Sequence, residues 1–197
     1  MKGRTFIPDI REKAAKKNVP VAFPDAEDVR TLKAALTLKD EKIAQPWLVG
    51  KAEAILKIAK DNGLALVGIP IIDPLKDADK DEHTKLLFEK RKAKGWTLEQ
   101  SAEATKSPLY YAGLLLATGK VGAVVGGNLS STGDVIRAAI HTVGTAPGIS
   151  TVSSYFIMVF PEKLLCYADC AVVPNPTDSQ LADIALTSAK NFRAVTG

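Results

Sequence analysis

The chain has 197 residues, of which 46% are hydrophobic and 24% charged, and its formal net charge is +4 at pH 7. This composition is that of an ordinary globular protein with room for one core, or for one domain and part of a second. A nucleic-acid-binding protein would need a dense basic face with interleaved aromatic residues, so we expect no nucleic-acid partner. No apolar run approaches the roughly 18 residues of a transmembrane span, and the charged N-terminus lacks a signal-peptide core. We therefore expect no membrane partner and a cytoplasmic location.

The cysteines and histidines give no indication of a disulfide or a metal site. Cys166 and Cys170 lie in an apolar stretch, and along one strand they would be too far apart to bond to each other. The sequence predicts two buried thiols in a reducing compartment. His83 and His141 have no carboxylate or histidine at the spacing of a metal site, so we expect no metal.

Short apolar runs alternate with helical periodicity from the N-terminus to residue 144, which predicts an α/β domain with a mainly parallel sheet. Strands are expected at 20–23, 46–49, 68–72 and 121–125, and helices at 27–40, 52–60, 81–94, 97–105 and 109–117. A Gly/Pro-rich stretch at 144–148 then indicates a hinge. Beyond it, strands at 150–160 and 164–173 predict a hairpin, and a last helix opens near 175–178. The expected domains are 1–144, with an anion-binding loop, and 149–197, the truncated beginning of a second α/β domain.

The segment GGNLSSTGDVIR, residues 126–137, follows the apolar run 121–125 and leads into an amphipathic helical pattern. Its glycines allow a tight turn, and Asn128, Ser130, Ser131 and Thr132 are able to cap the helix. Unpaired N–H groups, hydroxyls and the positive end of the helix dipole would then converge, with Arg137 about a turn further on. This arrangement predicts an anion pocket, most naturally for phosphate. Glycine and serine also occur at such junctions merely as turn and cap residues, and that interpretation stays open.

Four segments in order resemble the phosphate acetyltransferase/phosphate butyryltransferase family. They are VAFPDAEDVRTLKAA from residue 21, FEKRKAKGWTLEQSAE from residue 88, the GGNLSSTGDVIRAAI loop, and TVSSYFIMVF with ADCAVVPNPTDSQLADIA near the C-terminus. Gly133 stands where alanine is usual, and Asn128-Leu129 replace a frequent pair that includes histidine.

The resemblance implies a layered α/β/α fold like that of isocitrate and isopropylmalate dehydrogenases. It also implies reversible acetyl transfer between coenzyme A (as acetyl-CoA) and phosphate (as acetyl phosphate), with coenzyme A as a substrate, no cofactor, and a homodimer. The family's Ser-Arg and Asp motif, to which transition-state roles are assigned, does not occur in the sequence. The catalytic residues are therefore unknown, and we expect negligible acetyl transfer by this chain alone. The substrate-binding residues that the resemblance implies are Arg137, Arg91, Asn128, Ser130, Ser131 and Thr132.

Several alternatives remain at this point. The charged helix around Arg91 indicates by itself only a solvated cation, and Asp134 is better explained as support for the helix dipole. Asp169 on an apolar strand needs partners if it is buried. The acyl group is acetyl, butyryl or propionyl. A truncated or non-catalytic module that binds coenzyme A or phosphate is a second candidate function. A decarboxylating dehydrogenase of isocitrate type is disfavoured because no metal-binding acidic cluster is evident.

Overall fold

The computed structural model describes residues 3–197. Contacts divide the chain into two units, one of Ala14–Gly144 and one that joins residues 3–13 to Thr145–Gly197. Residues 3–13 were expected within the first domain, 1–144, whereas they pack with the C-terminal segment. The Arg4 backbone N–H donates to the Pro161 carbonyl at 3.2 Å, and the Arg4 guanidinium pairs with Glu162 at 2.8 Å.

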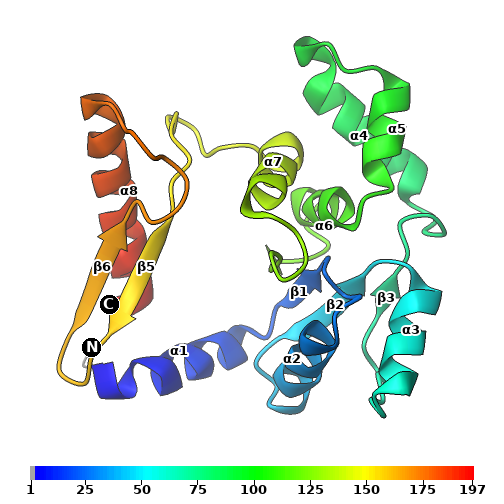
Figure 1. The fold of residues 1–197 in the computed structure, drawn as a ribbon, viewed down its shortest axis with the longest axis horizontal. Coiled ribbons are helices and arrows are strands. Elements are labelled where there is room, and N and C mark those ends of the chain that lie inside the picture. The colour runs from blue at the N-terminus through cyan, green and yellow to red at the C-terminus, as the bar shows by residue number, and fades with distance from the viewer. Residues whose placement is uncertain (1–2) are drawn as a thin grey trace. The chain divides into compact units, whose positions relative to one another are not determined.

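The first unit, Ala14–Gly144, is built on a four-stranded sheet of order β3-β2-β1-β4. All three strand pairs are parallel, and Val21 of β1 lies opposite Pro46 on one side and Ala123 on the other. The chain places β2 and β3 to one side of β1 (Figure 1). It then returns to place β4 on the other side of β1. The strands are β1 (Pro20–Phe23), β2 (Gln45–Val49), β3 (Ile71–Ile72) and β4 (Ala123–Val124).

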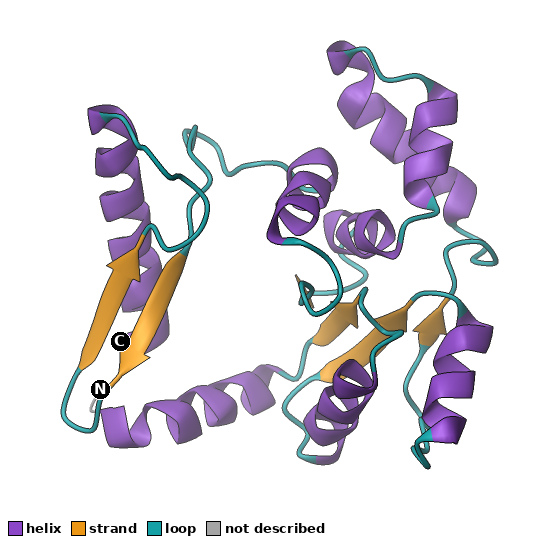
Figure 2. Ribbon diagram, viewed as in Figure 1, coloured by secondary structure: helices purple, strands orange, loops and turns teal. Residues whose placement is uncertain are grey.

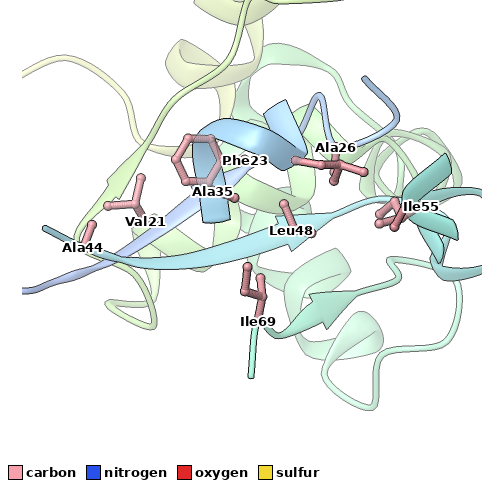
Figure 3. Packing of buried hydrophobic residues seen from close by; sticks show 10 residues of the cluster. Val21, Phe23, Ala26, Ala35, Ala44, Leu48, Ile55 and Ile69 are labelled. Carbon is pink, nitrogen blue, oxygen red and sulfur yellow. The ribbon is translucent and has the colours of Figure 1, made fainter. Parts of the chain in front are cut away.

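Helices cover both faces of this sheet because alternate strand residues point to opposite sides. On one face, helices α2 (Val29–Asp40) and α3 (Ala52–Asp61) pack on side chains that include Phe23 and Leu48 (Figure 3). On the other face, α6 (Pro108–Ala117) sets Tyr111, Ala112 and Leu115 against Ala22 and Val49. The α/β fold with a parallel sheet is therefore confirmed.

Three further helices complete the unit, α4 (Lys80–Arg91), α5 (Leu98–Thr105) and α7 (Thr132–Thr142). The helix expected at 81–94 ends as a 3-10 turn at Lys92–Lys94, and the strands expected at 68–72 and 121–125 are shorter than predicted. Helices α6 and α7 approach closely at Gly113, where a Cβ atom would lie only 2.2 Å from the Thr142 hydroxyl oxygen. The absence of a side chain at Gly113 therefore allows α7 to lie directly against α6.

The second unit contains an antiparallel hairpin of β5 (Tyr155–Val159) and β6 (Leu164–Ala168), with α8 (Asp178–Thr196) beside β6 (Figure 2). The hairpin is as predicted, with shorter strands. Helix α1 (Gly3–Lys17), which begins in this unit, was not predicted. The prediction of two buried thiols is wrong, because Cys166 is exposed and Cys170 only half-buried. A groove of about 380 Å³ between β6 and α8 leaves the Cys166 side chain open.

Candidate functional site

A cavity of about 440 Å³ lies at the carboxyl ends of β1 and β4. These are the two strands between which the order of the sheet reverses, because β2 lies on the far side of β1. In open α/β sheets this crevice is where ligands bind, since neighbouring connections leave the strand ends in opposite directions. The lining residues are Phe23, Asp25, Arg30, Thr31, Ala34 and residues 125–128.

The loop after β4 wraps around the carboxylate of Asp25, which is only 5% exposed. One oxygen, Oδ2, accepts the backbone N–H groups of Gly127 at 2.6 Å and Asn128 at 2.7 Å. The other oxygen accepts the Ser130 hydroxyl at 2.6 Å. Gly127 has a φ of 109°, a conformation that favours glycine, and this turn aims the two successive amides at one carboxylate. Burial raises the pKa of Asp25, but the hydrogen bonds from Ser130, Gly127 and Asn128 outweigh it and hold the pKa below its usual value.

This arrangement corrects the expectation of unpaired donors at Asn128 and Ser130. The Asn128 backbone N–H and the Ser130 hydroxyl both donate hydrogen bonds to Asp25. The Asn128 side-chain amide donates to the Thr31 hydroxyl at 3.2 Å. The reason is that parallel strands end at the same edge of the sheet. The Asp25 carboxylate, which follows β1, therefore lies beside the loop that follows β4. Sequence reasoning missed this role of Asp25. The acidic residue directly after the first strand, Pro24-Asp25, was the available indication.

Arg30 forms the polar rim of the cavity. Its guanidinium pairs with the Asp28 carboxylate at 2.6 Å and reaches the Asn128 carbonyl at 3.5 Å. The hydrogen bonds from Arg30 hold the pKa of Asp28 below its usual value. The Arg30 side chain is 69% exposed, and its positive charge is paired with Asp28. Sequence reasoning did not select this residue either.

Ser131 and Thr132 form the start of α7, as the sequence predicts. The Ser131 hydroxyl accepts the Asp134 N–H at 3.2 Å and donates to the Asp134 carboxylate at 2.7 Å. Asp134 in turn accepts from the Arg137 guanidinium at 2.9 Å. Arg137 therefore lies on the same exposed face of α7 as the cap, one turn further along, and its side chain is 61% exposed. Thr132 is the first residue of the helix and is exposed.

Arg91 at the end of α4 lies against an aromatic cluster formed by Trp96, Tyr110 and His141. The Arg91 guanidinium carbon is 5.6 Å from the centre of the Trp96 ring, and the Trp96 and His141 rings meet edge to face at 5.1 Å. The Tyr110 hydroxyl lies 2.8 Å from Nδ1 of His141. Within residues 3–197, the buried Nε of Arg91 has no hydrogen-bond partner.

The same cluster connects the two arginines that the sequence selected. Burial lowers the pKa of His141 below its usual value, and the positive charges of Arg91 and Arg137 lower it further. Burial raises the pKa of Tyr110, and both arginines act on its hydroxyl in the opposite sense. Arg91 from α4 and Arg137 from α7 thus direct their charges at one pair of rings. Arg137 lies on α7 one turn before His141, and we call Arg91, Trp96, Tyr110, Arg137 and His141 the arginine–aromatic cluster.

Asp169, in the other unit, stabilises a turn. Its carboxylate accepts the Ser154 N–H and hydroxyl at 2.6 and 2.7 Å and the N–H groups of Val172 and Val173 at 2.8 and 2.7 Å. Desolvation raises the pKa of Asp169, but the hydrogen bonds from Val173, Ser154 and Val172 outweigh it and place the pKa far below its usual value. The need of Asp169 for partners is thus met within the turn. Among the described residues, no group of three or more His, Cys, Asp or Glu side chains is arranged to hold a metal ion, and no helix is long and apolar enough to cross a membrane.

Residues 5–197 match the sequence pattern of a protein family described as phosphate acetyl/butaryl transferase. The chain belongs to this family. Over 98% of its length it is 34% identical to a phosphate acetyltransferase of Acetivibrio thermocellus and 37% identical to one of Thermoanaerobacterium thermosaccharolyticum. It spans 59% and 60% of the lengths of these two relatives.

Solved structures agree with the family assignment. A phosphotransacetylase from Streptococcus pyogenes superposes with a TM-score of 0.91 at 32% identity, and the EutD phosphotransacetylase from Staphylococcus aureus with a TM-score of 0.89 at 30% identity. Each comparison covers 99% of this chain and 60% or 59% of the solved chain. Two of the four segments that carried the resemblance hold members of the arginine–aromatic cluster, residues 88–103 with Arg91 and Trp96 and residues 126–140 with Arg137.

Proposed function

We propose that the protein takes part in phosphate acetyltransferase chemistry, the reversible reaction of acetyl-CoA and phosphate to acetyl phosphate and coenzyme A. The observation that carries the proposal is that Arg91 lies over the Trp96 ring and Arg137 lies one turn before His141 of the same aromatic cluster, in a chain that belongs to this family. The relatives compared above are named for acetyl transfer, which favours acetyl over butyryl as the acyl group.

The residue types fit the charges of the substrates. Coenzyme A and acetyl phosphate are both polyanions, so holding them side by side requires fixed cations. Arg91 has no carboxylate partner in the described part of the chain, which leaves its charge for a ligand. The aromatic faces of Trp96 and Tyr110 add a surface on which a base ring is able to stack. Attack of the thiolate on acetyl phosphate develops negative charge on the carbonyl oxygen and on the departing phosphate, and preorganised donors stabilise both.

We assign binding roles to the residues of this chain. Arg91 and Arg137 hold phosphate groups of coenzyme A, while Ser131 and Thr132 present the positive end of α7 to the anions. Asn128 and Ser130 act through Asp25, which fixes the loop on which the helix begins. The proposal includes coenzyme A as substrate and no resident cofactor, a homodimer, a cytoplasmic location, and no nucleic-acid or membrane partner.

The binding roles are tested by calorimetry with coenzyme A. We expect Arg137→Ala to weaken binding by about 1.5–3 kcal/mol, the scale of a hydrogen bond to a charged group. Arg4→Ala is a matched control, because Arg4 is also an exposed arginine in an ion pair, with Glu162, but lies in the other unit. The loss in Arg91→Ala should depend less on salt than the loss in Arg137→Ala, since Arg91 is the more buried of the two. An unchanged affinity in folded Arg137→Ala would refute the assignment.

The reaction is tested by thioester formation from acetyl phosphate and coenzyme A. The chain is assayed alone and after addition of the C-terminal part of a longer relative. We expect negligible turnover by the chain alone, because binding one substrate without transition-state groups does not raise turnover. The mixture should turn over, and Arg137→Ala should lower its turnover. A mixture that binds coenzyme A but forms no thioester would contradict the proposed reaction.

A further inference from the structure

His141 is the one group of the arginine–aromatic cluster that is able to change its charge near neutral pH. It lies on α7, four residues and therefore one turn beyond Arg137. Its ring is half-buried between Trp96 and Tyr110, at centroid distances of 5.1 and 5.8 Å. The mechanism proposed above gives this half-buried histidine no role.

We propose that His141 is a third anion-binding group of the cluster, which takes up a proton from solvent when a phosphate-bearing ligand binds to Arg91 and Arg137. The inference rests on the proposed function for the identity of that ligand, coenzyme A. The imidazole gains one proton and one positive charge, and no covalent bond is formed or broken.

The hydrogen bond to Tyr110 permits this change of charge. The Tyr110 hydroxyl lies 2.8 Å from Nδ1 of His141, and a hydroxyl is able either to donate or to accept. The contact therefore survives in the neutral and in the protonated ring. A carboxylate in the same place would hold the ring protonated, and a backbone N–H would hold it neutral. The hydroxyl of Tyr110 leaves both states accessible.

The charges that face His141 oppose its protonation only while the site is empty. Helix α4 contributes Arg91, helix α6 contributes Tyr110, and α7 itself contributes Arg137 and Asp134. Asp134 is paired with Arg137 and does not offset Arg91. In the free protein, burial and the two arginines keep the ring neutral at pH 7, since they lower its pKa. A bound dianion neutralises both arginines and adds attraction, so the pKa rises and a proton enters.

His83 is a natural internal control, because it is the only other histidine of the chain. Its ring is 1% exposed and packs edge to face on Tyr111 at 4.9 Å. Burial lowers its pKa, and its charged neighbours are Lys120 and the carboxylates Asp77, Asp79 and Glu82. None of these belongs to the arginine–aromatic cluster, so a ligand bound there should not change the titration of His83.

The test is a pH titration of the two histidine ring signals by NMR, with coenzyme A and, separately, with inorganic pyrophosphate. His141→Gln assigns the signals by removing one of them. We expect coenzyme A to move the midpoint of the His141 signal to higher pH and to leave the His83 signal in place. If coenzyme A binds without moving the His141 midpoint, the inference is overturned while the proposed function stands. If coenzyme A does not bind but pyrophosphate moves the midpoint, the function fails and the anion-binding role of His141 holds. If neither anion binds, both fail.

Calorimetry with coenzyme A provides a second readout, the affinity ratio of wild type to His141→Gln. The phosphate of the ligand takes up its own proton near pH 6, but that contribution is common to both proteins and cancels in the ratio. We expect a ratio within twofold of one at about pH 8. The ratio should rise to as much as about tenfold as the pH falls, because a ligand that raises the pKa of His141 by one unit gains a factor of ten in affinity. A ratio that stays flat with pH in the folded variant would overturn the inference.

Discussion

Asp25 and Asp169 each gather backbone N–H groups and a serine hydroxyl around one carboxylate, but over very different distances along the chain. The partners of Asp25 lie 102 to 105 residues away, in the loop after β4. The partners of Asp169 lie within 15 residues, in its own turn and directly before β5. One carboxylate connects two separate strand ends beside a cavity, and the other closes a local turn.

Asp25 therefore contributes to a ligand site, whereas Asp169 contributes only to the fold. Asp25 fixes the loop from which α7 begins, and α7 carries Ser131, Arg137 and His141. Asp169 fixes a turn of the second unit that holds no member of the arginine–aromatic cluster. Both side chains accept hydrogen bonds from several donors, so the number of hydrogen bonds does not distinguish them. The two carboxylates differ in the elements that they connect.

The largest effect is expected for Asp25→Ala. Removing the carboxylate leaves the amides of Gly127 and Asn128 and the Ser130 hydroxyl without an acceptor in a largely buried place. We expect the free energy of unfolding to fall by about 3 kcal/mol, as for a buried charged acceptor that is lost with its network. Coenzyme A affinity should fall as well, because the start of α7 loses its support. Denaturant unfolding and calorimetry measure the two effects.

Asp169→Ala is the matched comparison. We expect a smaller loss of stability, about 2 kcal/mol, because Asp169 is only half-buried and water reaches its donors more readily. Its coenzyme A affinity should equal that of the wild type. Asp25→Asn should fall between the wild type and Asp25→Ala, since the amide oxygen still accepts one set of N–H groups. Equal losses of affinity in Asp25→Ala and Asp169→Ala would refute the contrast.

The dependence of stability on pH tests the role of the Asp25 carboxylate. Both carboxylates have a folded-state pKa below the value in the unfolded chain. Their stabilisation is therefore complete above the unfolded pKa of about 4 and is lost as the pH falls through the folded pKa. We expect the free energy of unfolding of Asp25→Asn to decline less steeply below about pH 5 than that of the wild type. Urea midpoints measured across this range test the sign, and parallel declines would contradict it.

The sequence predicted the pattern of elements well and the polar contacts between them poorly. Strand β1 and the junction between α5 and α6 are where the apolar runs and Pro108 indicated, because periodicity and turn residues are local properties. Helix α1 was missed, since its sequence is charged throughout and contains Pro8. The bonds of Asp25 could not be read from the sequence, because they depend on which strand ends meet in the sheet. Arg91 was selected through the family resemblance, and its contact with Trp96 required the fold.

Helix caps offer a smaller comparison between the units. Ser131 caps α7 with its hydroxyl, and Thr177 caps α8 in a full capping box with Gln180. We expect Ser131→Ala and Thr177→Ala each to lower the free energy of unfolding by about 1 kcal/mol. Only Ser131→Ala should also weaken coenzyme A binding, because it releases Asp134, the partner of Arg137. Thermal unfolding and calorimetry on both variants decide this, and a loss of affinity in Thr177→Ala would count against it.

The smallest effect is expected for Gly133→Ala, in the first turn of α7. A Cβ at this position meets only the Ser131 hydroxyl oxygen, at 3.8 Å, which is an ordinary contact. Alanine loses less backbone entropy in a helix than glycine, so the free energy of unfolding should rise by about 0.5–1 kcal/mol. Gly113→Ala is the control with the opposite sign, because its Cβ would meet the Thr142 hydroxyl oxygen at 2.2 Å and push α7 away from α6. Denaturant midpoints should therefore move in opposite directions for the same chemical change. Destabilisation by Gly133→Ala would mean that the start of α7 requires glycine for a reason other than space.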